Sequence, residues 1–497
     1  MRRTSVLLRT GLALAGLAVP SAALGAAQAA GHHPGLHAGL HGGHGVATSA
    51  ARAGSGVRGD FDGDGNVDLA VGAPGGDEVR VQYTHAAPSG SHVEWLQPNT
   101  ASDVYAPQFG YALAIGDFNG DGYSDLAVGA PSFTTPPTGI GVRETRGAVF
   151  VYDGSSAGLV AQPLAIEGPY DGDEPYELGG SMAARDVNGD GTDDLAVTLW
   201  GADTGNIRVY HGSGSGLGTS YQALNDYEAQ SLAFGDVDGD GHPELMAGST
   251  VDLTNSTDID KGDVKIWHGT ASGLRASHPQ KIGGDQVGVF RVWGYAVASG
   301  DVNGDGYADL VAGAPYDRYV GTRRSAGTIV LLTGGPHGLR AARHQLLNEK
   351  RVNPGWRDGN GFGTALAITA VDGDRFDDVV VGAASERVGG LKRAGAAYLV
   401  RGSAHGLTTR HHQRITQATT GIPGALTAKA GFGTALWATS LDADRYGDVV
   451  VGAPDTSTST RGGGYARIPG SRSGLRPGAA TGAFSSVTGW RLGTSVR

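Results

Sequence analysis

A nine-residue acidic pattern occurs seven times in this chain and limits the possible fold more than any other feature. Its clearest copy, at 301–309, reads Asp-Val-Asn-Gly-Asp-Gly-Tyr-Ala-Asp, and an apolar run ending in Gly313-Ala-Pro315 follows. Acidic or amide side chains at alternating positions, with glycine where the chain folds back, bring oxygen ligands to one point. That donor set suits calcium, which takes six to eight oxygens at about 2.3–2.6 Å.

Four more complete copies lie in register with this one, at 60–68, 117–125, 186–194 and 236–244. Two weaker copies, at 370–378 and 440–448, lack the first carboxylate and the second loop glycine. We therefore expect about five calcium sites, with weak or no binding at the two degenerate loops.

An EF-hand loop also begins with alternating acids, but it requires a bidentate Glu at position twelve and flanking helices. Position twelve of the complete copies is Val71, Val128, Val197, Ala247 and Ala312. Each loop runs instead into a short apolar, β-branched segment typical of a buried strand. These observations exclude the EF-hand.

The N-terminus has the pattern of a secretory signal peptide. Arg2, Arg3 and Arg9 precede an apolar stretch, 12–24, which runs into Ala27-Gln28-Ala29. We expect residues 1–30 to be removed on export and residues 31–56, rich in Gly, Ala and His, to form a disordered linker. Since no other segment has about 18 uninterrupted apolar residues, we expect a secreted protein without a membrane span.

The composition excludes some partners. The formal net charge is −11, and nearly half of the acidic residues stand at ligand positions of the repeats. The acidity therefore belongs mostly to the loops and argues against nucleic acid as a partner. Cysteine is absent, so an exported form of this chain has no disulfides to hold it.

Two further motifs complete each repeat. An aromatic-Gly or Leu-Gly pair precedes most loops, as in Phe109-Gly110 and Phe362-Gly363, and Gly-Ala-Pro or a variant follows. A strand, a Gly-rich turn and Leu end most repeats, as in 151–159. Successive loops are 50 to 70 residues apart, enough for four short strands. Seven such units predict an all-β, seven-bladed propeller with four-stranded antiparallel blades over 57–497.

The three motifs together resemble FG-GAP repeats, as found in the propeller of integrin alpha subunits and in glycosylphosphatidylinositol-specific phospholipase D. The resemblance implies that each loop joins strands one and two of a blade. It also implies that side chains one, three, five and nine and the position-seven carbonyl bind calcium. The implied side-chain ligands are Asp60, Asp62, Asp64, Asp68; Asp117, Asn119, Asp121, Asp125; Asp186, Asn188, Asp190, Asp194; Asp236, Asp238, Asp240, Glu244; Asp301, Asn303, Asp305 and Asp309. The implied carbonyl ligands belong to Asn66, Tyr123, Thr192, His242 and Tyr307.

The chain ends complement each other. The first loop has no Phe-Gly strand ahead of it, whereas residues 490–497 resemble such a strand with no loop after it. We expect the two ends to pair in one blade, which would close the ring and remove exposed sheet edges.

Arg58-Gly59-Asp60 spells an integrin-recognition tripeptide. Because Asp60 is also the first residue of a calcium loop, we expect it to point inward, and the tripeptide is interpreted as structural.

A recognition surface is expected on the propeller face opposite the loops, where the long insertions between strands gather. Exposed aromatic and arginine side chains there are candidates for partner contacts. They are Tyr170, Tyr176, Trp200, Tyr316, Tyr319, Arg323, Arg324, Trp356 and Arg357.

Two functions remain open from the sequence. The first is a monomeric, secreted binding or adhesion module for an extracellular protein or glycan, in which calcium mainly staples the blades. The alternative is a polysaccharide lyase or hydrolase that uses the propeller funnel. A cluster of His, Tyr, Arg and acidic residues at the funnel would favour the enzyme, since the fold alone does not decide.

Overall fold

The computed structural model describes residues 57–84, 92–98, 106–135, 144–161, 165–169, 176–201, 206–225, 227–250, 262–289, 291–317, 325–442, 444–455, 462–485 and 491–497, together with Leu24–Gly25. The expected signal peptide and linker lie outside these residues, except for the two-residue strand β1 (Leu24–Gly25). This strand pairs in parallel with Ser231 and Leu232. Within the described ranges, the structure contains no helix with the length and apolar character needed to cross a bilayer.

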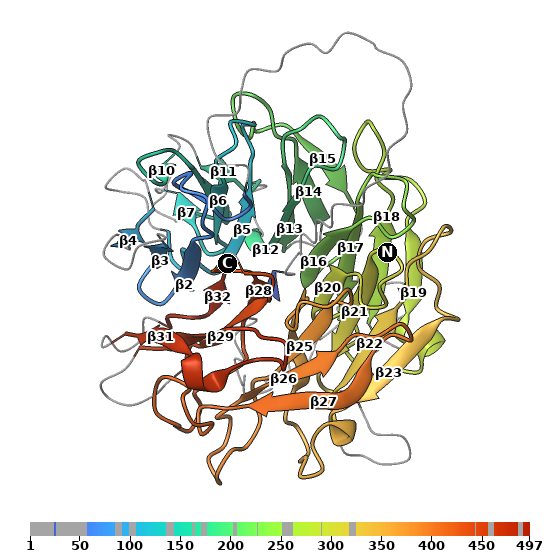
Figure 1. Ribbon diagram of the computed structural model, residues 1–497. Helices are drawn as coiled ribbons and strands as arrows, with labels where there is room; N and C mark the ends of the chain where they lie inside the picture. The colour runs from blue at the N-terminus through green and yellow to red at the C-terminus, as the bar shows by residue number, and fades with distance from the viewer. Residues whose placement is uncertain are drawn as a thin grey trace, which may run out of the picture.

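Seven antiparallel sheets, here called blades 1 to 7, are arranged around a central axis (Figure 1). We give the strands of blades 1 to 4 first, each in order from the central axis outward. Blade 1 has β32 (Ser495–Val496), β2 (Leu69–Ala73), β3 (Glu78–Tyr83) and β4 (His92–Leu96); blade 2 has β5 (Ala112–Gly116), β6 (Asp125–Ala130), β9 (Ala148–Asp153) and the paired segments β10 (Val160–Ala161) and β11 (Ile166–Glu167). Blade 3 has β12 (Glu177–Arg185), β13 (Asp194–Trp200), β14 (Asn206–Tyr210) and β15 (Tyr221–Leu224); blade 4 has β16 (Ser231–Gly235), β17 (Glu244–Ser249), β18 (Asp263–Trp267) and β19 (Gln280–Gly283).

The remaining blades follow the same order. Blade 5 has β20 (Val297–Gly300), β21 (Asp309–Ala314), β22 (Thr328–Leu332) and β23 (His344–Asn348); blade 6 has β24 (Phe362–Thr369), β25 (Asp378–Ala383), β26 (Ala396–Arg401) and β27 (Thr408–Ile415); blade 7 has β28 (Leu436–Thr439), β29 (Asp448–Ala453), β30 (Gly464–Ile468) and β31 (Thr481–Phe484). A small ribbon, β7 (Thr134–Thr135) and β8 (Glu144–Thr145), and three 3-10 turns, η1 (Gly284–Val287), η2 (Glu349–Arg351) and η3 (Pro477–Ala479), lie between strands. The predicted all-β, seven-bladed propeller is confirmed.

The second strand from the axis is the most apolar strand of a blade because its residues are buried on both faces of the sheet. All residues of β6, β21, β25 and β29 are buried, because each of these strands packs against a neighbouring blade on both faces. Half of the residues of the outer strand β27 are exposed, and the strand carries mostly polar side chains. A continuous apolar run therefore marks a second strand, and a polar run marks the rim.

The Phe-Gly and Gly-Ala-Pro glycines meet across the boundary between blades. Gly110 of blade 2 places its carbonyl against Gly72 of blade 1, where a Cβ would clash with it. Gly363 and Gly313 make the same contact between blades 6 and 5. Gly110 and Gly363 also have positive φ values, 86° and 96°, which other residues rarely adopt. Glycine is thus required on both sides of this contact.

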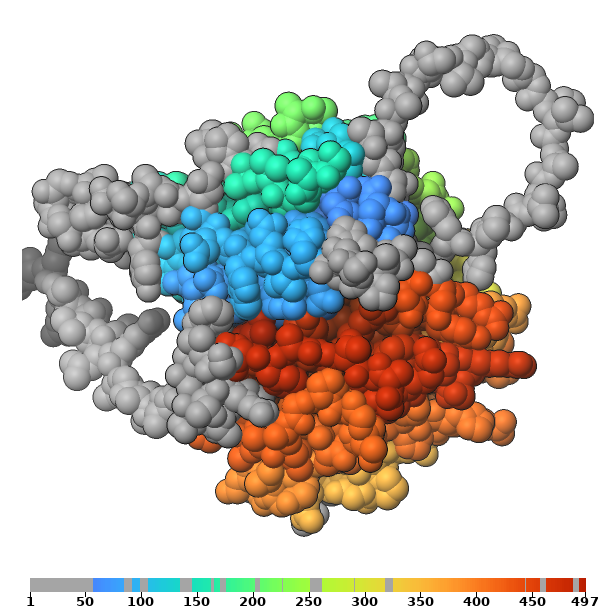
Figure 2. Space-filling model, turned by 60° about the vertical axis from the view of Figure 1, so that its left-hand side comes forward, coloured from blue at the N-terminus to red at the C-terminus, as the bar shows by residue number. Residues whose placement is uncertain are grey.

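The last residues of the chain supply the inner strand of blade 1. Val496 pairs with Val71, and the backbones of Arg497 and Ala70 exchange hydrogen bonds. Gly493, which follows Leu492, then contacts Gly452 of blade 7 as the Phe-Gly glycines contact their neighbours. Figure 2 shows the N-terminal blade, in blue, lying directly against the C-terminal one, in red.

Deletion of residues 489–497 is expected to destabilise the protein by about 3–6 kcal/mol. Leu492 and Val496 are each 1% exposed, and burying one such side chain contributes about 1.5–3 kcal/mol. The free energy of unfolding, measured by denaturant titration of the full and truncated chains, checks this. An unchanged value would show that the pairing does not hold the ring closed.

Candidate metal-binding loops

Each acidic loop directly precedes the second strand of a blade, at one end of the propeller. In blades 2 to 7 the loop follows the first strand, whereas in blade 1 the first strand, β32, comes from the end of the chain. The loop 117–125, for example, joins β5 to β6. Its glycines Gly120 and Gly122 have φ values of 73° and 91°, so the chain turns sharply at both positions. This double turn directs backbone N–H groups of the loop toward the side chains of positions one, three and five.

The first carboxylate of a complete loop is held by the backbone of its own turn. Asp117 Oδ1 accepts hydrogen bonds from the N–H of Gly120 (2.6 Å) and Asp121 (3.1 Å), and its Oδ2 accepts one from Gly122 (3.0 Å). Asp60, Asp186, Asp236 and Asp301 accept equivalent bonds.

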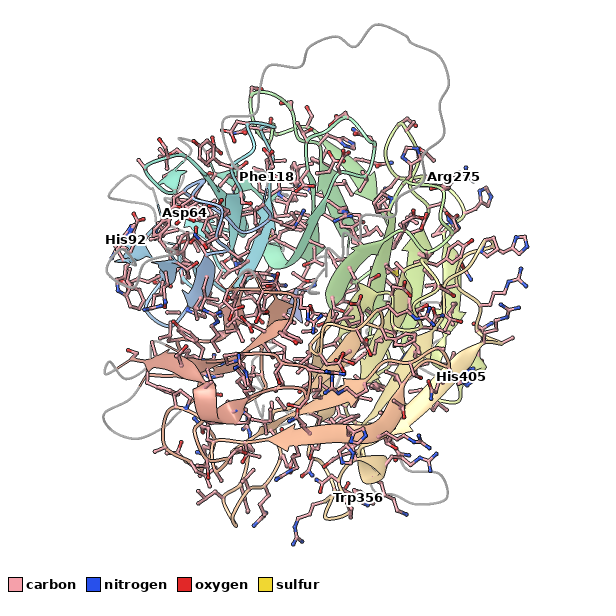
Figure 3. The ribbon with its side chains drawn as sticks, in the orientation of Figure 1. Asp64, His92, Phe118, Arg275, Trp356 and His405 are labelled. Atoms are coloured by element: carbon pink, nitrogen blue, oxygen red, sulfur yellow. The ribbon has the colours of Figure 1, made fainter. Side chains whose placement is uncertain are left out.

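Positions five and seven are tied together in every complete loop. Asp64, Asp121, Asp190, Asp240 and Asp305 accept the backbone N–H of Asn66, Tyr123, Thr192, His242 and Tyr307 at 2.8–3.1 Å. At position three, the side-chain oxygens of Asp62, Asn119, Asn188, Asp238 and Asn303 accept the N–H of position five. Figure 3 labels Asp64 among the side chains of blade 1.

The position-nine carboxylate connects the loop to the Gly-rich turn that follows strand three. Asp125 Oδ2 accepts the N–H of Phe118 (2.7 Å), while its Oδ1 accepts that of Gly154 (2.8 Å). The equivalent residues Asp68, Asp194, Glu244, Asp309, Asp378 and Asp448 are all at most 1% exposed. Glu244 reaches the corresponding partners, Val237 and Gly269, in spite of its longer side chain.

Burial makes these position-nine carboxylates costly to ionise. Desolvation raises the pKa of Asp68, Asp125 and Glu244 to about 8 and that of Asp309 to about 7. A cation beside them would lower the pKa again by favouring the charged form.

The donor set fits a hard divalent cation. One carboxylate oxygen from each of Asp60, Asp62 and Asp68 lies within 4.8 Å of the others, and Asp236, Asp238 and Asp240 form a similar group. Clustered oxygens of this kind are the ligands that calcium prefers. In each of these two loops, three of the four predicted side-chain ligands are therefore brought together.

Successive loops also bind one another across the blade boundaries. The N–H of Ser124 donates to the carbonyl of Asp60 (3.0 Å), and the N–H of Asp377 donates to that of Asp301 (2.9 Å). In addition, the Tyr123 ring covers Gly63 of the preceding loop, where a Cβ would clash. A loop thus organises both its own blade and the contact with the next one.

Arginine side chains lie at the acidic centres of the two degenerate loops. Arg401 Nη1 lies 2.7 Å from both Asp372 Oδ2 and Asp378 Oδ2. In blade 7, Arg467 Nη2 lies 2.8 Å from Asp448 Oδ2 and 3.6 Å from Asp442 Oδ2. A guanidinium therefore supplies positive charge beside positions three and nine of both loops.

Histidines face the loops of blades 3 and 4. His211 Nδ1 lies 3.1 Å from Asp194 Oδ1, and this contact raises the pKa of His211. His268 Nδ1 lies 3.5 Å from Glu244 and 3.7 Å from Asp238. Sequence reasoning missed these residues, although His211, His268 and Arg401 all occupy the same variable position, directly before the glycine of the strand-three turn.

The tripeptide at 58–60 is engaged inside the protein. Asp60 is fully buried, and Arg58 bonds to Asp193 (2.9 Å) and to the carbonyls of Ile115 and Ala184. Arg58 also lines a cavity of about 320 Å³ between inner strands near the axis, whose other titratable side chain is Arg497. The described lining of this cavity thus lacks the acidic and histidine side chains that the enzyme hypothesis requires there.

A polar cluster lies instead on the opposite face, between blades 5 and 6. Glu386, 2% exposed, accepts hydrogen bonds from Tyr398 Oη (2.7 Å) and Arg414 Nε (2.8 Å). Asn353 Nδ2 contacts both Tyr398 Oη (2.9 Å) and Glu349 Oε1 (2.8 Å). Glu349 is fully buried, and desolvation raises its pKa to about 7.

The expected recognition residues are only partly brought together. Tyr316, Trp356 and Arg357 line one cavity beside this cluster. Trp200 packs on Gly180 and donates to the carbonyl of Ala229, and Tyr176 packs against the core, so both have structural contacts. The remaining candidates, Tyr170, Tyr319, Arg323 and Arg324, lie outside the described residues.

Comparison with known proteins agrees with this architecture. The FG-GAP repeat model matches residues 109–152 and 293–332, and the FG-GAP-like repeat model matches residues 60–128 and 186–247. Integrin alpha pat-2 of Caenorhabditis briggsae is 26% identical over 294 residues, which cover 58% of this chain and 19% of that protein. Phosphatidylinositol-glycan-specific phospholipase D of Rattus norvegicus is 28% identical over 387 residues, 65% of this chain and 42% of that protein.

The chain therefore spans only about a fifth of the integrin subunit that it matches. Among solved structures, the exotype rhamnogalacturonan lyase YesX aligns over 84% of this chain and 71% of its own, with a TM-score of 0.37 and 14% identity, which is too low to bear on function. The repeat matches and the seven blades define an FG-GAP β-propeller. More particularly, it is an integrin-alpha-like propeller.

Proposed function

We propose that this protein is a secreted, calcium-binding propeller that acts as a binding or adhesion module for an extracellular protein or glycan. The observation that carries the proposal is that the two faces of the propeller differ in structure. One face consists of interlocked acidic loops and turns, whose groups are used in holding the blades together. The opposite face carries the long connections, where Trp356 and Arg357 line a cavity.

Calcium has a structural role in this proposal. Asp60, Asp117, Asp186, Asp236 and Asp301 begin the five loops that hold the ion. Each ion neutralises carboxylates that are buried at the junction of a loop and a strand-three turn, as Asp125 is between Phe118 and Gly154. In blades 6 and 7 the guanidinium groups of Arg401 and Arg467 take over this neutralisation, so those blades need no ion. Metal binding in such sites adds directly to folding stability.

Secretion is supported by the charged start, the apolar stretch and the Ala-x-Ala site of residues 1–30. The similarity to integrin alpha subunits supports a role in ligand binding, and nothing in the composition favours nucleic acid as a partner.

An array of immobilised glycans and extracellular proteins, probed with the labelled protein in calcium, tests the binding function. We expect a small set of ligands to be retained, and retention to weaken when the face that carries Trp356 is altered. Absence of binding to every glycan, protein and cell surface offered would overturn the proposal.

A polysaccharide-cleaving enzyme is the second candidate, and one observation favours it. Glu349 and Glu386 are two buried carboxylates linked through Asn353 and Tyr398 beside a cavity. Pairs of carboxyl groups commonly carry out acid and base chemistry on sugars. Release of reducing ends from acidic polysaccharides, lost in Glu386→Gln, would establish it. Intact polysaccharide after prolonged incubation would dismiss it.

A further inference from the structure

A cavity of about 1250 Å³ opens on the face opposite the acidic loops. Its walls come from the connection between blades 5 and 6 (353–360) and from the connection between β25 and β26 (385–393), with Arg414 of β27 at one side. Figure 3 labels Trp356 in this region, near the outer edge of the propeller. The cavity exceeds the roughly 300–1,000 Å³ of drug-sized ligand sites, so its volume fits a short oligomer.

The charge of this cavity is opposite to that of the whole chain. Five basic side chains line it, against two acidic ones, although the chain carries a formal net charge of −11. The basic residues are Arg357, Arg387, Lys392, Arg393 and Arg414; the acidic ones are Asp358 and Glu386. Since Arg414 is paired with Glu386, four basic residues and one acidic residue, Asp358, remain to act on a ligand.

These four cations are accessible from solvent. Arg357, Arg387 and Lys392 are exposed, and Arg393 is half-buried. Basic groups that converge on one cavity of an acidic protein create a local positive potential, which attracts and orients anionic ligands. Guanidinium groups in addition form paired hydrogen bonds with carboxylate or sulfate oxygens.

The floor of the cavity is rigid and polar. Asn353 and Asn360 both line it, and their side-chain amides donate to the same oxygen of buried Glu349, at 2.8 Å and 2.7 Å. Glu349 Oε2 is buried and accepts no hydrogen bond from the residues that the structure describes. Glu386 is fixed by Tyr398 and Arg414. A buried network of this kind holds its amide and carboxylate groups in place before a ligand arrives.

The combination of accessible cations with a rigid polar floor distinguishes between classes of anionic ligand. An acidic peptide would also find the cations, and its backbone N–H and carbonyl groups match the amides and the fixed carboxylate of the floor, but it has no saturated sugar ring to lay on an aromatic face. A sugar carries hydroxyl groups that both donate and accept, and its ring can lie on an aromatic face such as that of half-buried Trp356. Hydroxyl groups, anionic groups and an apolar ring face occur together in acidic oligosaccharides.

We propose that this cavity binds an acidic oligosaccharide, with its carboxylate or sulfate groups on Arg357, Arg387, Lys392 and Arg393 and its hydroxyl groups on the amide floor. The proposal rests on the binding function proposed above and names the class of ligand. Uronate and sulfated sugars share the chemistry that these residues recognise.

Calorimetric titration of the full chain, in constant calcium, tests this assignment. The probes are an oligogalacturonate, a heparin-derived oligosaccharide, a neutral cello-oligosaccharide of equal length and a poly-glutamate peptide. We expect binding of one or both acidic sugars, weakening as NaCl rises from about 50 to about 500 mM because salt screens exposed charges. Whichever of the two acidic sugars binds more tightly identifies the preferred anionic group, which is uronate for the oligogalacturonate and sulfate for the heparin-derived oligosaccharide.

The double variant Arg387→Gln/Lys392→Gln is expected to weaken this binding at least about tenfold, because two charge-assisted contacts are lost. Arg351→Gln provides the matched control, since Arg351 is exposed on η2 nearby and does not line the cavity. Melting temperatures of both variants should equal that of the parent, since within the described part of the chain the Arg387 side chain makes one hydrogen bond, at 3.3 Å to the Gly390 carbonyl.

Three results would overturn the assignment. They are equal binding of the neutral sugar, tighter binding of poly-glutamate, and unchanged affinity in the double variant. Failure of all four probes would also reject it but would leave the wider binding function standing, because the array of proteins and glycans tests that separately.

Discussion

Excess chelator at pH 8 is expected to lower the melting temperature of the protein by about 10–20 °C. A ligand present at 100 times its dissociation constant stabilises the folded state by about 2.7 kcal/mol per site, and five proposed sites add their contributions. The physical reason is that each ion offsets the repulsion among carboxylates that the loop holds within a few ångströms. Differential scanning calorimetry with calcium and with chelator measures the shift.

The calcium effect should also grow with pH. In the ion-free protein, burial raises the pKa of Asp68 and Asp125 from 3.8 to about 8. Between these values the folded state keeps protons that the unfolded state has lost, so ion-free stability falls as pH rises. Calcium requires the ionised form, and its contribution is therefore expected to be larger at pH 8 than at pH 5.

A matched pair of variants separates the sites from general charge effects. Asp305 and Asp444 both occupy position five, and both accept the N–H of position seven, at 3.1 Å and 2.7 Å. Asp305→Asn should reduce the calcium-dependent shift in melting temperature by about the contribution of one site. Asp444→Asn, in a degenerate loop, should leave this shift unchanged. No loss of stability in chelator would disprove the structural role of calcium.

Replacement of Arg401 by methionine is expected to destabilise the protein by about 3–5 kcal/mol, with or without calcium. Arg401 lies 2.7 Å from both Asp372 and Asp378, and Asp378 is only 1% exposed. Removal of one partner leaves a buried carboxylate uncompensated, which is among the most costly single changes. Methionine keeps most of the aliphatic stem, so the loss measures the guanidinium more than its packing.

Arg375→Met is the control for this experiment. Arg375 belongs to the same loop but lies exposed over the Phe376 ring at 4.8 Å, a contact expected to contribute at most about 1 kcal/mol. The double variant Arg401→Met/Asp372→Asn should recover part of the lost stability, because one of the two unpaired charges is gone. A loss below about 1 kcal/mol for Arg401→Met would show that the loop does not depend on this cation.

The repeated loops predict much of the architecture, because each repeat carries its own local signals. Glycine at positions four and six predicts the turn at 117–125, and the apolar run after it predicts β6. Both signals are local and do not depend on distant parts of the chain. Seven such units with room for four strands each lead to a seven-bladed propeller, since stacking in a ring buries both faces of each sheet.

Contacts between repeats are harder to predict, because they join residues about 40 to 60 positions apart. The sequence shows a Phe-Gly pair and a Gly-Ala-Pro motif, but not that Gly110 packs on Gly72 of the preceding blade. The same holds for Tyr123, which was predicted only as a carbonyl ligand and also covers Gly63 with its ring. Both contacts require glycine for steric reasons that appear only when the blades are side by side.

By itself, the sequence determined the number of blades, the order of strands and the positions of the oxygen donors, because these depend on spacing within one repeat. Only the tertiary structure decided that Arg401 and Arg467 neutralise the two degenerate loops and that four basic side chains converge on one cavity of an acidic chain. Charge pairing and cavity formation depend on distances between separate elements. Those distances are set by the packing of blades against each other and leave no periodic pattern in the chain.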